Sequence, residues 1–320
     1  MITSRRRRVL VVAVGVAVTA CTSDVGDRTG TPVETTTALT VGSPNERGGP
    51  VDLGDGRTIH LQCGGSGQPT VVLVSGLGDG ADVWSVPADR EPQGPTVLAG
   101  VAGFSRVCAY DRPNTGPGRS TAVPQPTSAA DAAEDLAELL MLSDEPGPFV
   151  LVGHSYGGPI IRVYASSHPD EVAGLVLVDG LSENLVDGLT PAQQAVFEAL
   201  NTPPVGGDAE VLDLRGTFQQ LRQSSPPPVV PTIVLTADRP QLTRDVVASG
   251  QLPAEVDQEF ADALWKAQLV AQDELAAMFP GADHVTSTDS DHYIHTENPQ
   301  LVIDSIREVV DTVRSSQPDG

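Results

Sequence analysis

The stretch that decides the fold reads FVLVGHSYG over residues 149–157. Its first four residues are all apolar, which indicates a strand buried on both faces. A helical pattern follows from about Ile160 to Ser166. Between strand and helix, Gly153, Ser155 and Gly157 form a G-x-S-x-G pattern, which places a serine on a sharp turn that only small neighbours permit. A bare match arises by chance roughly 0.2 times in a chain of this composition, so the specificity comes from the position between strand and helix.

Short apolar strands alternate with helices on both sides of this stretch. A capping box at Ser128–Asp131 indicates the start of one helix. A second helical pattern covers about residues 301–313, near the end of the chain. The order predicts a mostly parallel sheet with helices on both faces. The other expected strands are Thr58–Gln62, Thr70–Ser75, Arg106–Tyr110, Leu175–Val178 and Thr232–Thr236.

Residues 181–228 interrupt this alternation. They hold several prolines around a short helical stretch near residues 192–200. An excursion of that length between two core strands is typical of a lid over a site. The alternative is an insertion without a role in the site.

The N-terminal residues read as an export signal. Arg5–Arg8 precede an apolar run of 12 residues, Val9–Ala20, which is shorter than the roughly 20 residues of a membrane-spanning helix. Val18–Cys21 resembles the lipobox of bacterial lipoproteins, which implies cleavage after residue 20 and a lipid on Cys21. An ordinary secretory peptide, with Cys21 incidental, is the alternative. The arginines leave both the general and the twin-arginine export routes open.

Composition restricts the partners. The formal net charge is −23, and loss of the four arginines in residues 1–20 would make it about −27. Such a charge disfavours nucleic acid and anionic lipid headgroups, so membrane attachment would come through the lipid on Cys21. Residues 22–50 are rich in small and polar residues, and we interpret residues 21–50 as the lipidated cysteine followed by a flexible tether.

Over residues 51–315 the chain resembles the α/β-hydrolase family. The Ser155 turn is one match, and the order of serine, acid and histidine is another. The resemblance implies an α/β fold: a mostly parallel eight-stranded sheet with helices on both faces, spanning residues 51–316, with the lid as an insertion. The further matching segments are Val74–Gly78, Tyr110–Pro113, Gly174–Asp179 and Asp291–His295 with Asn298-Pro299.

The same resemblance implies catalytic roles. Ser155 would be the nucleophile and His292 its base, with His295 as the alternative histidine three residues on. The backbone N–H groups of Leu77 and Tyr156 would form an oxyanion hole.

The acid of the triad stays open between two residues. The family usually places it a few residues after the seventh strand, where Pro240 stands in this chain and Asp238 comes two residues early. Asp179 closes the sixth strand, where some members carry the acid instead. Two positions depart from the usual pattern: Ser75 stands where the family often has histidine, and Asp291 where it often has glycine.

The remaining cysteines are Cys63 and Cys108. The family places the two strands that would carry them side by side, which implies a disulfide; two separate buried thiols are the alternative. We see no cysteine–histidine spacing of a zinc site and no G-x-G-x-x-G after a strand, so we expect no metal and no cofactor.

These features together predict an extracytoplasmic serine hydrolase. It would be lipid-anchored to the bacterial cell membrane, or secreted if the lipobox is not used. We expect a monomer that cleaves small-molecule carboxylic esters through an acyl-enzyme on Ser155. The alternatives are an acyltransferase, other non-ester chemistry of the same fold, and a binding lipoprotein without catalysis.

Overall fold

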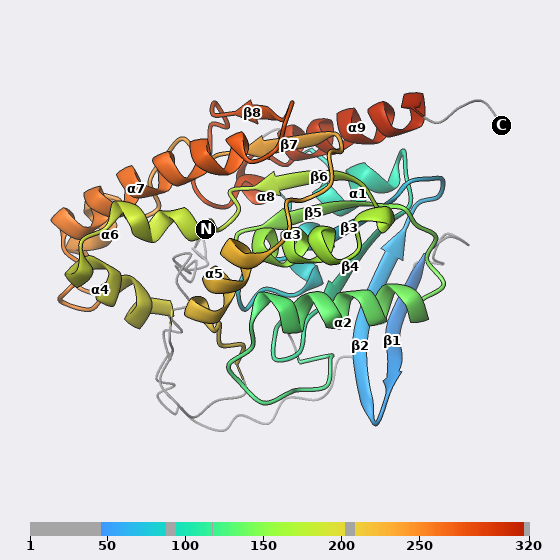
Figure 1. The fold of residues 1–320 in the computed structure, drawn as a ribbon, viewed down its shortest axis with the longest axis horizontal. Coiled ribbons are helices and arrows are strands. Elements are labelled where there is room, and N and C mark those ends of the chain that lie inside the picture. The colour runs from blue at the N-terminus through green and yellow to red at the C-terminus, as the bar shows by residue number, and fades with distance from the viewer. Residues whose placement is uncertain (1–45, 88–93, 117, 202–208, 317–320) are drawn as a thin grey trace, which may run out of the picture.

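A single eight-stranded sheet organises the molecule (Figure 1). The computed structural model describes residues 46–87, 94–116, 118–201 and 209–316. The strand order is β1-β2-β4-β3-β5-β6-β7-β8. β2 pairs antiparallel with both β1 and β4, and the remaining pairs are parallel. This confirms the expected fold class.

The strands follow the apolar runs of the sequence. The four strands β3 to β6 at the centre of the sheet are almost continuously buried, as strands covered on both faces must be. The strands are β1 (Arg47–Gly54), β2 (Arg57–Gly64), β3 (Thr70–Val74), β4 (Val107–Asp111), β5 (Phe149–His154), β6 (Val172–Val178), β7 (Thr232–Leu235) and β8 (Asp283–Val285).

Two groups of helices cover the two faces. Alternate residues of one strand point to opposite sides, so Val71 and Leu73 join one apolar cluster, and Val72 and Val74 join the other. The first cluster is closed by α1 (Val97–Ala102) and α9 (Pro299–Ser316), and the second by α2 (Ala129–Leu142) and α3 (Gly157–Ser167). The two helix pairs lie on opposite sides of the sheet in Figure 1.

The remaining helices gather mainly beyond the ends of the parallel strands. The predicted lid at 181–228 carries three of them, and a long helix, α7, lies between β7 and β8 where no element was predicted. Figure 1 shows α4, α6 and α7 grouped at the end toward which β6 points. The elements are η1 (Ala81–Ser85), η2 (Pro169–Glu171), η3 (Glu183–Gly188), α4 (Pro191–Asn201), α5 (Leu214–Gln223), α6 (Arg244–Ala248), α7 (Gln258–Ala277) and α8 (Ile294–Glu297).

The N-terminal boundary differs slightly from the expectation. β1 begins at Arg47, so residues 47–50, which were assigned to the tether, pair with β2 and belong to the sheet. The signal sequence, Cys21 and the tether up to residue 45 lie outside the described residues. No helix in the described part of the chain has the length and apolar character needed to cross a membrane.

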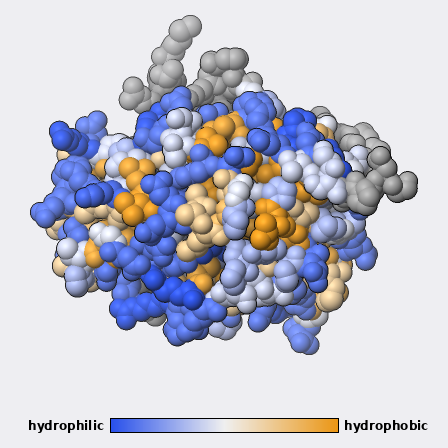
Figure 2. Space-filling model, turned by 45° about the horizontal axis from the view of Figure 1, so that its top comes forward, coloured by the Kyte–Doolittle hydropathy of each residue, from blue (hydrophilic) through white to orange (hydrophobic). Residues whose placement is uncertain are grey.

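A disulfide joins Cys63 of β2 to Cys108 of β4. The two residues are direct partners in the antiparallel register, which is why their side chains meet. The face of the molecule in Figure 2 is mostly hydrophilic, with its hydrophobic residues in separate patches.

Candidate active site

Ser155 occupies a strained turn between β5 and α3. Its φ is +50°, a left-handed conformation that costs energy for a residue with a side chain. The flanking glycines make the turn sterically possible. A Cβ on Gly153 would lie 2.5 Å from the carbonyl oxygen of Gly157, and a Cβ on Gly157 would lie 2.2 Å from that of Val74. The turn therefore requires both glycines and holds Ser155 out of the helix that follows.

His292 lies in the loop between β8 and α8 and is paired with Asp179. Its Nδ1 donates to Oδ2 of Asp179 over 2.6 Å, and both side chains are almost fully buried. The other oxygen of Asp179 accepts from the backbone N–H of Ala237 at 3.1 Å and from Nε2 of Gln268 at 3.4 Å. Asp179 has a φ of +43° at the end of β6. The carboxylate is thus fixed by three donors and orients the imidazole, leaving Nε2 for the pocket side.

Asp238, the other candidate acid, does a different job. Its two carboxylate oxygens accept from the backbone N–H groups of Asp289 at 2.8 Å and Ser290 at 3.0 Å. The backbone N–H of Asp238 also donates to the carbonyl of Ser290. Asp238 therefore clamps the loop that carries His292, and the imidazole pairs with Asp179 instead.

Two further histidines pack behind His292. Nε2 of His154 donates to the backbone carbonyl of His292 over 3.0 Å. Burial, and then the neighbouring His295 and His292, lower the pKa of His154 well below its usual value. His295, the alternative base, packs its ring 4.2 Å from that of His154 and 4.8 Å from that of Trp84. Neither of its nitrogens has a partner among the described residues, and burial lowers its pKa to about 3. Both rings are neutral supports of the His292 loop.

The two predicted oxyanion donors flank Ser155. No described residue accepts a hydrogen bond from the backbone N–H of Leu77 or of Tyr156. The loop that carries Leu77 lies close to Ser155, since a Cβ on Gly76 would be 3.3 Å from Cβ of Ser155 and 2.9 Å from Nδ1 of His154. Two unpaired N–H groups beside a serine are the donors that a developing oxyanion needs.

Ser75 replaces the histidine often found in this loop and braces it in another way. Its Oγ donates to the carbonyl of Gly80 at 2.9 Å and accepts from Nε1 of Trp84 at 3.0 Å. Asp79 follows in the same loop, and burial raises its pKa to about 6, against the opposing effects of Arg112 and His292. Ser75 and Trp84 thus brace the loop from within its own segment.

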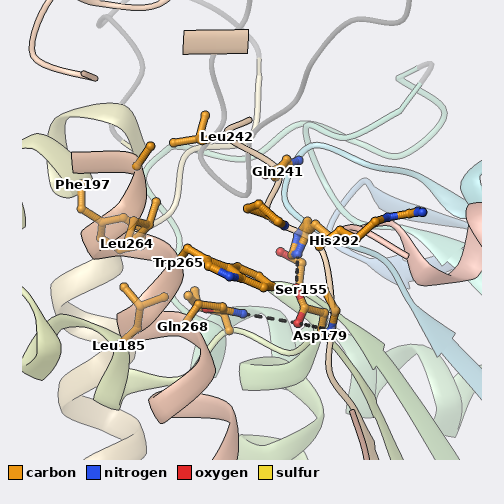
Figure 3. A pocket seen from close by; sticks show the side chains of 15 residues that line it. Ser155, Asp179, Leu185, Phe197, Gln241, Leu242, Leu264, Trp265, Gln268 and His292 are labelled. Atoms are coloured by element: carbon orange, nitrogen blue, oxygen red, sulfur yellow. Dashed lines mark hydrogen bonds and ion pairs between the residues drawn. The ribbon is translucent and has the colours of Figure 1, made fainter. Parts of the chain in front are cut away.

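Ser155, Asp179 and His292 line one cavity (Figure 3). Its volume is about 70 Å³, which is small beside the roughly 300–1,000 Å³ of pockets that bind drug-sized ligands. The lid and α7 both contribute lining residues, and Trp265 and Gln268 of α7 are directed toward Ser155 and Asp179 (Figure 3). The remaining lining residues are Leu181, Leu185, Phe197, Ala237, Arg239, Pro240, Gln241, Leu242, Ala261 and Leu264.

Sequence reasoning missed three residues that shape this site. Gln268 contacts Asp179, and Trp265 narrows the cavity; both lie on α7, whose helical pattern was not recognised. Gln268 and Gln272 are spaced by four, and Gln272 donates to the carbonyl of Gly180 at 2.6 Å. A spacing of four residues places both side chains on one face of a helix and could have indicated α7 from the sequence. The third residue, Glu210, lies in the lid, and no sequence motif marks it.

The chain has the α/β-hydrolase fold. The family's model, described as alpha/beta hydrolase fold, matches residues 69–217, which contain the Leu77 loop, the Ser155 turn and Asp179. The sheet order and the parallel strands agree with this assignment.

Lipases and other hydrolases are among the similar proteins. Lipase LipV of Mycobacterium tuberculosis is 30% identical over 122 residues, which cover 38% of this chain and 41% of the lipase. The monoacylglycerol lipase of Mycolicibacterium smegmatis is 31% identical over 150 residues, covering 41% of this chain and 52% of the relative. A putative carbamate hydrolase, RutD of Yersinia enterocolitica, is 35% identical over 125 residues, or 38% and 40% of the two chains. This chain spans about half or less of the length of these relatives.

Solved structures share the fold over most of the chain. A putative aryl esterase from Burkholderia cenocepacia has a TM-score of 0.53 at 19% identity, covering 84% of this chain and 100% of its own. An esterase from Thermogutta terrifontis has a TM-score of 0.51 at 21% identity, covering 84% and 98%. At these identities the likeness shows the fold alone.

Proposed function

We propose that this protein is a serine hydrolase that cleaves carboxylic esters through an acyl-enzyme on Ser155. The observation that carries the proposal is the 2.6 Å hydrogen bond from His292 to Asp179, in the same cavity as a serine on a strained turn. An imidazole fixed in this way has its Nε2 unprotonated and ready to take a proton from a hydroxyl.

The reaction follows from these positions. Oγ of Ser155 attacks the ester carbonyl while its proton passes to Nε2 of His292, and the N–H groups of Leu77 and Tyr156 bind the resulting oxyanion. The C–O bond of the alcohol then breaks, and His292 gives the proton to the leaving alkoxide. Water then loses a proton to His292 and attacks the acyl carbon. The bond from that carbon to Oγ of Ser155 breaks, Oγ takes the proton back from His292, and the carboxylic acid leaves. Asp179 stays ionised throughout and stabilises the imidazolium.

The cavity favours a short, uncharged acyl group. Its walls are mainly aliphatic and aromatic, and its volume of about 70 Å³ next to Ser155 suits an acyl group of a few carbons. Arg239 also lines the cavity, but Asp289 and Glu297 already pair with it. A charged acyl group would therefore lose its hydration there while competing for that partner. We therefore propose esters of small aliphatic acids as substrates.

Hydrolysis of p-nitrophenyl esters of increasing chain length tests this proposal, together with labelling by a fluorophosphonate. We expect the highest kcat/KM with acetate or butyrate, and a label on Ser155. Ser155→Ala should lose the label and at least roughly 10⁴-fold in kcat. A folded wild-type protein that takes no label, or equal activity in the Ser155→Ala variant, would overturn the proposal.

We further propose that the protein acts outside the cytoplasm, anchored through a lipid on Cys21. The lipobox-like Val18–Cys21 supports this, and so does the Cys63–Cys108 disulfide, a bond typical of oxidising compartments. Metabolic labelling with a radioactive fatty acid should mark the wild-type protein and leave Cys21→Ala unlabelled. Equal labelling of both proteins would contradict the anchor.

A further inference from the structure

A buried ion pair lies directly beneath the loop of the oxyanion hole. Arg112 follows β4, and Glu210 comes from the lid. Nε of Arg112 donates to Oε1 of Glu210 at 2.7 Å, and its NH2 group donates to Oε2 at 2.9 Å. Each side chain is 2% exposed. The pair therefore has almost no contact with water.

Both partners use their remaining hydrogen bonds on the same loop. The two terminal nitrogens of Arg112 donate to the carbonyls of Ser75 at 2.8 Å and Gly76 at 2.6 Å. Oε2 of Glu210 accepts from the N–H of Gly78 at 2.7 Å. These three peptide groups flank Leu77 on both sides. The side-chain pair thus fixes the peptides around Leu77 and leaves its N–H without an acceptor among the described residues.

Glu210 is itself held firmly. Its backbone N–H donates to the carbonyl of Asn114 at 3.0 Å, and the next N–H donates to Oε1 of Gln125 at 2.9 Å. Asp213 then donates to the carbonyl of Thr127 at 2.8 Å. This part of the lid is fastened to the loop that follows β4, so the carboxylate has a fixed position from which to hold Gly78.

Stability alone does not account for such a pair. Removing two charges from water costs several kcal/mol per ion, and apolar replacements of buried pairs are often neutral or stabilising. Preorganised backbone donors, in contrast, are worth about 10²–10³-fold in kcat when they stabilise an oxyanion. One buried pair holds the carbonyls of Ser75 and Gly76 and the N–H of Gly78, so the peptide that carries the N–H of Leu77 cannot turn that group away from the site.

We propose that Arg112 and Glu210 are positioning residues for the oxyanion hole, which hold residues 75–78 so that the N–H of Leu77 stays directed at the carbonyl oxygen of the substrate. This inference rests on the proposed esterase function. It also assigns the lid a part in the chemistry, because one member of the pair comes from the lid.

The chain offers a matched control at the other end of the same strand. Arg106 precedes β4 and forms a two-pronged pair with Glu145, at 2.9 and 2.6 Å. Their side chains are 16% and 5% exposed. This pair has the same chemistry as Arg112–Glu210 but lies far from Ser155, at the opposite end of the parallel strands.

The test compares the two pairs, each replaced by methionines: Arg112→Met with Glu210→Met, and Arg106→Met with Glu145→Met. We expect the first variant to lose about 10²-fold in kcat on p-nitrophenyl acetate, with KM changed less than about threefold, and to react with the fluorophosphonate more slowly by a similar factor. The second variant should keep kcat within about twofold. An unchanged kcat in a folded first variant, or an equal loss in both, would overturn the proposal.

A single-residue variant and amide hydrogen exchange test the same positioning role independently of the double variant. Glu210→Gln retains the shape of the side chain, so it serves if the double methionine variant does not fold; we expect about a tenfold loss of kcat, and no loss would overturn the proposal. Amide hydrogen exchange of residues 75–79 reports on the loop without any substrate. We expect these amides to exchange faster in the Arg112→Met, Glu210→Met variant and not in the Arg106→Met, Glu145→Met variant. Unchanged exchange in the first variant would refute the positioning role. A wild-type protein without Ser155-dependent labelling would instead refute the proposed function.

Discussion

The two ends of the parallel sheet are both held by buried or half-buried charge pairs, but they are built for different tasks. At the amino ends, the Cys63–Cys108 disulfide joins β2 to β4, and Arg106 just before β4 pairs with Glu145 in the segment before β5. At the carboxyl ends, Ser155 has a positive φ and the bonds of Arg112 go to a loop with an unpaired N–H. The interactions at the amino ends stabilise the packing of the strands, whereas those at the carboxyl ends hold residues in strained conformations.

The difference follows from what each end must do. A reactive group needs an exposed oxygen and unpaired donors, which a fully satisfied structure does not offer. Burial of His154 and His295 and the raised pKa of Asp79 belong to the same end. We therefore expect changes in the reacting groups at the carboxyl ends to alter rates, and changes at the amino ends to alter stability alone.

The largest expected effect separates the two aspartates at the carboxyl ends. Asp179→Asn should lower kcat by roughly 10⁴-fold, because an amide neither fixes the tautomer of His292 nor stabilises the imidazolium. Asp238→Asn should keep kcat within about tenfold while losing about 1–3 kcal/mol of stability, because its new NH₂ group would face a backbone N–H. Steady-state kinetics and urea unfolding of both variants measure this. A larger rate loss in Asp238→Asn would reverse the assignment of the acid.

The next effect concerns cohesion at the amino ends. The disulfide closes a loop with a sequence separation of 45, for which chain entropy gives about 4 kcal/mol of stabilisation. Replacing both Cys63 and Cys108 by alanine should lower the free energy of unfolding by about that amount and leave kcat unchanged. Denaturant unfolding and ester kinetics on the same sample test both halves. A fall in kcat without a fall in stability would contradict the expectation that the amino ends govern stability and not rate.

The smallest effect is a dependence of stability on pH. The pKa of His295 is about 3 in the folded protein, and it is about 6.5 in an unfolded chain. Between these values only the unfolded state binds the proton, so stability falls as pH decreases from 6.5 toward 3. The slope from this group is about 1.4 kcal/mol per pH unit. His295→Leu should flatten the curve by that amount in urea unfolding between about pH 4.5 and 5.5, where the unfolded histidine is almost fully protonated, and an unchanged slope would contradict the buried neutral ring.

Much of this architecture was readable from local patterns. The apolar strands, the capping box at Ser128–Asp131 and the Ser155 turn are set by neighbours in sequence, and the structure has them where the patterns indicate. The family resemblance added His292 and the pairing of Cys63 with Cys108. The α7 helix was missed because its pattern is weak, since only part of one face is buried.

The choice between Asp179 and Asp238 could not be made from the sequence. Both follow core strands, and their roles differ only in which atoms of the residue 283–292 segment each carboxylate meets. The same holds for Glu210, whose partners Arg112 and Gly78 lie 98 and 132 residues away. Sequence alone determined the elements and the serine on its turn, because those depend on steric limits and burial within a few residues. Only the tertiary structure decided the acid, the walls of the cavity and the support of the oxyanion loop, because these depend on contacts between segments whose separation along the chain carries no local signal.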